Sequence, residues 1–187
     1  VERGDIPAAV EQLTEASKRG GGKDAEILMQ RVTPLADRGA RCTGVLEGHV
    51  GAVRAVCVSD DGSRAVSGSV DGTLRLLDLA DRTCLQAIPT GSEPIAGVAL
   101  APDGRWAISA GQSVALWDLA DGRCLRSFAG HTGRVTSLSL RSDAAQALTG
   151  SEDRTVRLWD IETGECLRVF EGHTAAITCV CLSLDGR

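Results

Sequence analysis

Apolar and polar residues alternate in short runs along most of the chain, at the two-residue period of half-buried β-strands. The runs Val53–Ser59 and Val135–Leu140 show this alternation clearly. Asp-Gly pairs follow or separate such runs at Asp61-Gly62, Asp71-Gly72 and Asp103-Gly104. These pairs are common in hairpin turns, because glycine readily takes a positive φ. The pattern predicts a mainly β protein built from short antiparallel strands.

The strand pattern recurs as a long repeat that the three histidines mark. His49, His131 and His173 each follow a glycine and lie 82 and 42 residues apart, and Gly91-Ser92 stands at the intermediate position. A period of about 40 to 45 residues is typical of β-propellers, in which each blade holds four strands. We therefore divide the chain into full repeats at 48–90, 91–129 and 130–171 and a partial repeat at 172–187. All histidines then occupy repeat positions, which leaves none for catalysis or metal binding.

Each full repeat also ends a strand with Trp or Leu followed by aspartate, at Leu77-Asp78, Trp117-Asp118 and Trp159-Asp160. With the Gly-His pairs in register, residues 42–187 resemble the WD-repeat family of β-propellers. The resemblance implies a partial β-propeller of four-stranded antiparallel blades. It also implies that a histidine, a Ser or Thr, an aspartate and a tryptophan in each blade form a buried hydrogen-bonded set, which is tolerable only if every member has a partner.

The repeats match this implied network to different degrees. The third repeat has all four members, the first has leucine in place of tryptophan, the second lacks the histidine and the aspartate, and the fourth holds only the histidine. We therefore expect the second blade to be the least stable. The expected network residues are His49, Ser67, Asp71, Ser109, Trp117, His131, Thr149, Asp153, Trp159 and His173.

Residues 1–40 do not match the repeat and carry helical spacing instead. Apolar residues lie at Ala8, Leu13 and Ala16, and the run Gly20–Gly22 separates this stretch from a second one at 24–36. We expect a short α-helical hairpin that weakly resembles a tetratricopeptide helix pair. It is either the end of a helical region or a cap packed on the propeller.

The seven cysteines fit a reducing setting. Four of them, Cys42, Cys84, Cys124 and Cys166, each stand at the start of one expected outer strand. Residues at the same position of different blades are too far apart to form disulfides with one another. Cys179-Val-Cys181 has metal-like spacing but no second cluster, so we expect the cysteines to be small buried hydrophobes. The first 20 residues lack an apolar run, which together with free thiols favours a cytoplasmic protein.

Charge and composition exclude several function classes. The net charge is −5 and the arginines are scattered among acids, which disfavours nucleic-acid binding. No apolar stretch approaches the ~20 residues of a membrane span. Gly20-Gly21-Gly22-Lys23 follows a helical stretch and lacks a Ser or Thr after the lysine, unlike a phosphate-binding loop. We expect no catalytic, metal or cofactor site. We interpret Phe128 and Phe170, each three residues before the histidine of a Gly-His pair, as core.

The resemblance implies a non-catalytic scaffold that binds protein or peptide ligands on the face near the Gly-His pairs and second hairpin turns. An alternative is a regulatory or sensory segment of a larger signalling enzyme, such as a bacterial serine/threonine protein kinase. The loops of that face offer Val50, Val70, Glu93, Gln112, Thr132, Arg134, Glu152 and Thr174.

The number of repeats is small for a propeller. Closed propellers have four to eight blades, and residues 42–47 match an outer strand that no blade precedes. We therefore expect a fragment of a larger propeller protein, with missing blades or self-association covering its strand edges.

Overall fold

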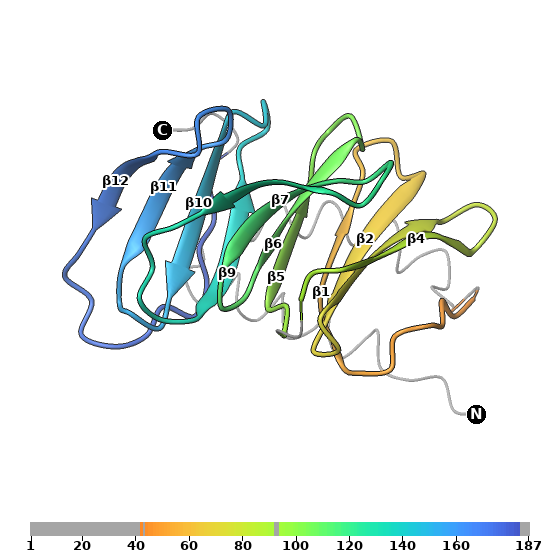
Figure 1. Cartoon of the computed structure of the whole chain (residues 1–187), viewed down its shortest axis with the longest axis horizontal. Helices are drawn as coiled ribbons and strands as arrows, with labels where there is room; N and C mark the ends of the chain where they lie inside the picture. The colour runs from red at the N-terminus through yellow and green to blue at the C-terminus, as the bar shows by residue number, and fades with distance from the viewer. Residues whose placement is uncertain (1–41, 43, 92–93, 184–187) are drawn as a thin grey trace, which may run out of the picture. The chain divides into compact units, whose positions relative to one another are not determined.

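The structure is a computed structural model that describes residues 42, 44–91 and 94–183. The expected helical hairpin of residues 1–40 lies outside the described residues, as do Ser92 and Glu93. Twelve strands form three four-stranded antiparallel sheets (Figure 1). Each sheet is a meander with its strands in chain order. The prediction of a partial β-propeller of four-stranded antiparallel blades is thus confirmed.

The sheets follow the repeats, and we call them blades 1, 2 and 3. Blade 1 contains β1 (Val53–Val58), β2 (Arg64–Ser69), β3 (Thr73–Asp78) and β4 (Thr83–Pro89). Blade 2 contains β5 (Gly97–Leu100), β6 (Trp106–Ala110), β7 (Val114–Asp118) and β8 (Cys124–Phe128). Blade 3 contains β9 (Val135–Leu140), β10 (Gln146–Ser151), β11 (Val156–Asp160) and β12 (Cys166–Phe170).

The inner strands bring the blades together. β5 contacts β1 on one side and β9 on the other, and all four of its residues are buried. One apolar cluster joins Val66, Leu74 and Ile88 of blade 1 to Val98 and Trp117 of blade 2. A second cluster joins blades 2 and 3. Burial of apolar side chains between neighbouring sheets therefore stabilises the arrangement.

The two phenylalanines differ in environment, and one expectation is wrong. Phe128 is 5% exposed and meets the ring of Trp159 in the next blade edge-on, with 5.8 Å between ring centroids. Phe170 is 41% exposed and is not core. The reason is that, within the described residues, no tryptophan of a following blade covers β12.

The expectation that the cysteines are buried is also wrong. Cys57 and Cys166 are half-buried, and the others are exposed: Cys42, Cys84, Cys124, Cys179 and Cys181. In each blade the pairing of the third and fourth strands shifts register just before the Trp or Leu position. The shift sets a cysteine of the fourth strand opposite that residue, as Cys124 is opposite Trp117. That cysteine lies at the start of the outermost strand, where no further strand of its sheet covers it. All seven thiols are free.

Two segments expected to form strands do not do so. Cys42 and 44–47 form no strand. Residues 177–183 of the partial fourth repeat also form no strand, yet they dock on blade 3. The amides of Val180 and Leu182 donate to the hydroxyls of Ser137 and Ser139, each at 3.0 Å. Ile177 is buried.

Candidate functional site

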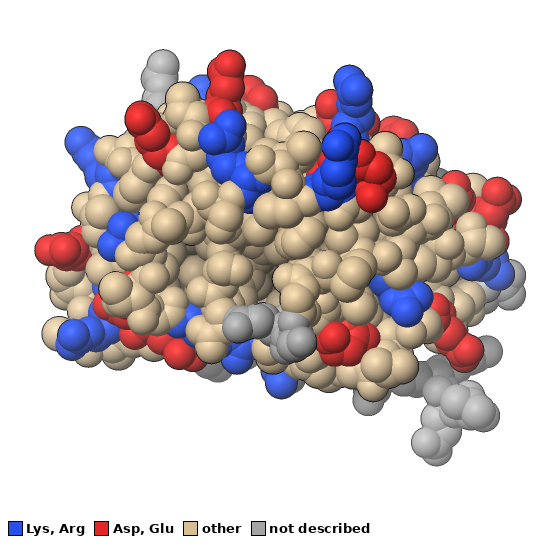
Figure 2. All heavy atoms as spheres, in the orientation of Figure 1, with Lys and Arg blue, Asp and Glu red and all other residues tan. Residues whose placement is uncertain are grey.

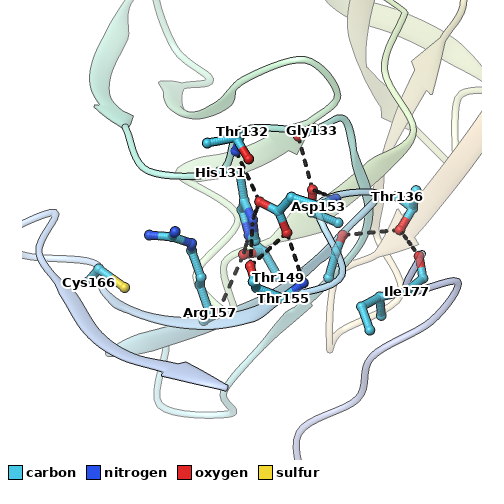
Figure 3. Close-up of polar contacts among 12 residues, drawn as sticks. His131, Thr132, Gly133, Thr136, Thr149, Asp153, Thr155, Arg157, Cys166 and Ile177 are labelled. Carbon is cyan, nitrogen blue, oxygen red and sulfur yellow. Dashed lines mark hydrogen bonds and ion pairs between the residues drawn. The ribbon is translucent and has the colours of Figure 1, made fainter. Parts of the chain in front are cut away.

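The most complete polar cluster lies in blade 3, around His131 (Figure 3). Its Nδ1 lies 2.7 Å from Asp153 Oδ2, and its Nε2 lies 2.7 Å from Thr149 Oγ1. The indole Nε1–H of Trp159 donates to the same Thr149 hydroxyl at 2.7 Å. The structure thus brings together the four residues that the third repeat supplies. They come from the loop before β9, from β10, from the turn after β10 and from β11.

One proton arrangement satisfies the cluster. The Thr149 hydroxyl accepts from Trp159 and donates to His131 Nε2, so His131 Nδ1–H donates to Asp153, as a neutral imidazole can. Burial lowers the pKa of His131 and outweighs the raising effect of Asp153. Burial raises the pKa of Asp153, but hydrogen bonds from Thr155, His131 and the amide of Thr132 outweigh it and lower the pKa overall. The stable pair is a neutral histidine beside an ionised aspartate.

Blade 1 repeats the cluster without its tryptophan. His49 Nε2 lies 2.8 Å from Ser67 Oγ, and His49 Nδ1 lies 3.0 Å from Asp71 Oδ2. Leu77, which is buried, occupies the tryptophan position and offers no donor. Burial raises the pKa of Asp71, but hydrogen bonds from Thr73, His49 and the amide of Val50 lower it overall.

Blade 2 and the partial fourth repeat hold smaller sets. Trp117 Nε1–H donates to Ser109 Oγ at 2.8 Å, and Ser92, at the histidine position, lies outside the described residues. His173 is exposed and forms no hydrogen bond with the residues described here.

The aspartate of the blade 1 cluster and that of the blade 3 cluster each position a pair of loops. Asp153 Oδ2 accepts the amide of Thr132 at 3.0 Å, and Glu152 N donates to Arg134 O at 2.9 Å. In blade 1, Asp71 Oδ2 accepts the amide of Val50 at 2.9 Å. In blades 1 and 3 the Gly-His loop and the second hairpin turn are therefore bound to each other by backbone hydrogen bonds as well as by side chains.

The candidate loop residues that the structure describes lie in loops and turns, and their exposure varies. Val50 is 94% exposed, and Val70 and Arg134 are half-buried. Glu93 lies outside the described residues. The remaining four are exposed: Gln112, Thr132, Glu152 and Thr174.

Sequence reasoning missed two supporting residues in each of the clusters of blades 1 and 3. Thr155 Oγ1 donates to Asp153 Oδ1 at 2.7 Å, and Thr73 Oγ1 donates to Asp71 Oδ1 at 2.6 Å. The shared Asp-x-Thr spacing could have signalled them. The other missed residue is an arginine on the third strand. In blade 1 it is Arg75, whose Nη2 donates to Gly48 O at 2.8 Å.

The arginine explains the glycine before His49 and the glycine before His131. Gly48 has a φ of 137°, and a Cβ on it would collide with the Arg75 guanidinium. Gly130 is crowded in the same way by Arg157. A side chain at either glycine would displace the arginine.

Among the described residues, no group of three or more His, Cys, Asp or Glu side chains is placed to hold a metal ion. In that same part, no helix is long and apolar enough to cross a bilayer.

The sequence also matches known proteins. The family described as "WD domain, G-beta repeat" matches residues 40–78, 122–160 and 164–187. The unmatched residues 79–121 include most of the second repeat, which has Ser92 in place of the histidine and lacks the aspartate.

Several curated relatives are similar over part of their length. Over 119 residues the chain is 34% identical to small ribosomal subunit protein RACK1y of Oryza sativa subsp. japonica, covering 59% of this chain and 35% of the relative. Over 117 residues it is 29% identical to WD repeat domain-containing protein 83 homolog of Dictyostelium discoideum, covering 62% and 36%. Over 111 residues it is 36% identical to U3 small nucleolar RNA-associated protein 15 homolog of Gallus gallus, covering 58% and 21%. The chain spans about a third or less of these relatives' length.

The family match covers more than half of the 187 residues, and the blades and histidine clusters agree with it. The chain belongs to the WD-repeat family of β-propellers.

Proposed function

We propose that the chain is a non-catalytic scaffold segment that binds protein or peptide ligands through its Gly-His loops and second hairpin turns. The observation that carries the proposal is the hydrogen bonding that holds the Gly-His loop and the second hairpin turn together in blades 1 and 3. Loops held in one geometry lose little entropy on binding, which favours affinity. Val50 adds an exposed apolar side chain to this face.

The character of the surface supports a protein ligand. Basic and acidic side chains are interspersed on the face drawn in Figure 2, without a continuous basic stripe. A nucleic-acid ligand would favour such a stripe. The relatives' names include a ribosomal subunit protein and a CCR4-associated factor, which is consistent with a fold used inside assemblies.

The proposal includes a reducing compartment and further packing partners. Seven free thiols suit the cytoplasm. Leu167, Val169 and Phe170 of β12 are all at least 40% exposed, so we infer that further blades or a second copy of the chain cover them. The coverage of only about a third of the relatives supports a larger propeller protein.

Affinity purification with the full chain tests the docking face. The double variant Val50→Glu and Thr132→Lys changes two exposed side chains at the Gly-His loops, and Arg123→Glu changes an exposed residue in the turn between β7 and β8. We expect the double variant to lose at least ten-fold in recovery of specific partners from cells that make the protein, and Arg123→Glu to keep them. Equal recovery by all three proteins would contradict the proposal.

A further inference from the structure

A groove lies between blades 2 and 3, at the end of the strands opposite the Gly-His loops. Its volume is about 580 Å³. Blade 2 contributes Trp106, Leu116 and Leu125 to its lining, and blade 3 contributes Ala145, Asp160 and Glu162. Trp106 is the first residue of β6, whereas the second hairpin turn follows the last residue of that strand. The groove is therefore separate from the proposed docking face.

The matching position between blades 1 and 2 has different chemistry. Arg64 and Trp106 are equivalent, because each begins the second strand of its blade and pairs with the aspartate that ends the third. Arg64 and Arg105 line that smaller space, whose volume is about 160 Å³. The large apolar groove thus lies only between blades 2 and 3 of the described blades, and it is not a feature that recurs with each repeat.

Trp106 stands apart from the other two tryptophans. Trp117 and Trp159 donate their indole N–H groups to Ser109 and Thr149. Trp106 packs at the edge of the second core cluster and remains partly exposed. Its indole N–H has no hydrogen-bond partner among the described residues, so it is available to an incoming acceptor such as a peptide carbonyl.

The blade 3 side of the groove is acidic. Asp160 Oδ1 accepts the amide of Thr163 at 2.8 Å. This hydrogen bond is the largest cause of a lowered pKa for Asp160, which is ionised at neutral pH. Glu162 is exposed beside it. Arg126 is the one basic residue in the lining, and its Nη1 donates to the carbonyl of Thr163 at 2.7 Å. The groove therefore has two carboxylates, of Asp160 and Glu162, and one guanidinium that already has a hydrogen-bond partner.

The geometry points to a second docking site in this groove, for a protein segment that presents a bulky apolar side chain next to a lysine or arginine. The apolar side chain packs on Trp106, Leu116 and Leu125, and the cation lies beside Asp160 and Glu162. Leu125 is 51% exposed, so the groove opens along β8 and suits an extended segment better than an enclosed small molecule. This site goes beyond the proposed function and needs none of the Gly-His loops.

Selection from a random displayed 12-residue peptide library against the full 187-residue chain tests the inference. We expect enriched peptides to pair Leu, Phe or Trp with an adjacent Lys or Arg. Synthetic copies should shift the indole N–H NMR signal of Trp106, identified by its loss in Trp106→Phe, and leave those of Trp117 and Trp159 unmoved. Trp106→Gln, which mirrors Gln146 of blade 3, should weaken their binding at least ten-fold.

Two variants keep the test decisive. Glu162→Lys alters only an exposed side chain, so it should fold normally and still weaken the peptides at least five-fold. Val50→Glu, at the Gly-His loops, should leave them unchanged, which separates this site from the proposed function. The inference is overturned if no such peptides are enriched, if Trp106→Gln and Glu162→Lys bind them as well as the wild type, or if Val50→Glu abolishes binding.

Discussion

Three equivalent hydroxyls provide a test of the buried networks, because each serves a different number of partners. Thr149 accepts from Trp159 and donates to His131. Ser67 contacts the histidine of its blade, His49, and has leucine at the tryptophan position. Ser109 contacts the tryptophan of its blade, Trp117. Removing the Thr149 hydroxyl therefore leaves two buried groups without a partner, whereas removing that of Ser67 or of Ser109 leaves one.

The expected costs follow from these counts. Leaving one buried polar group unsatisfied costs about 1–3 kcal/mol. Thr149 is 0% and Trp159 is 1% exposed, so water cannot replace the lost hydroxyl. Thr149→Val should lower the free energy of unfolding by about 2–5 kcal/mol. Ser67→Ala and Ser109→Ala should each lower it by about 1–3 kcal/mol.

Equilibrium urea unfolding of the full chain, followed by far-ultraviolet circular dichroism, measures these differences. Ser127→Ala, which removes an exposed hydroxyl from β8, is the control and should change the free energy by less than about 0.5 kcal/mol. If Thr149→Val costs no more than Ser67→Ala and Ser109→Ala, the counting of partners is wrong.

Three further predictions concern pH, backbone and packing. Burial holds the pKa of His131 below 6.5. The stability that neutral His131 contributes is therefore present above about pH 6.5 and is lost as pH falls towards the lowered pKa. Urea unfolding from neutral pH to about pH 5.5 should show that the free energy of unfolding falls in the wild type and falls less in His131→Gln. Asp71 and Asp153 have pKa values below 3.8, so a second loss should begin below that pH as these carboxylates are protonated, and Asp153→Asn should reduce it. Gly48→Ala should destabilise the protein by about 2 kcal/mol or more, because Gly48 has a positive φ and the new Cβ would collide with Arg75. Gly62→Ala should cost only about 1 kcal/mol, because Gly62 has a φ of 70° but open space around its Cβ position. Similar thermal midpoints for the two variants would count against the arginine contact. Phe128→Ala should cost about 3–5 kcal/mol and Phe170→Ala much less by urea unfolding, and equal costs would show that Phe170 is packed.

The repeat made most of the fold predictable from the sequence. Strand alternation and Asp-Gly turns locate the strands, because both depend on residues close together in the chain. The regular spacing of His49, His131 and His173 then divides the strands into blades. The His131 cluster was implied by the resemblance to the WD-repeat family, because the third repeat supplies every member of the family's set.

Features that depend on contacts between blades could not be predicted in this way. Phe128 and Phe170 occupy the same repeat position, and only the neighbouring blade makes one buried and the other exposed. The cysteines resemble core residues by type, but the outermost strands leave several in solvent. The groove at Trp106 arises where side chains of two blades meet, and repeat alignment of a single blade does not reveal it.

Hydrogen–deuterium exchange with and without a bound protein partner tests the central claim most directly, because it maps the docking face on the intact chain. The account predicts protection of the Gly-His loops and second hairpin turns, at 48–53, 70–73, 130–135 and 152–155, with little change in the outer strands β4, β8 and β12. Protection confined to those outer strands, with unchanged exchange in the loops, would contradict it.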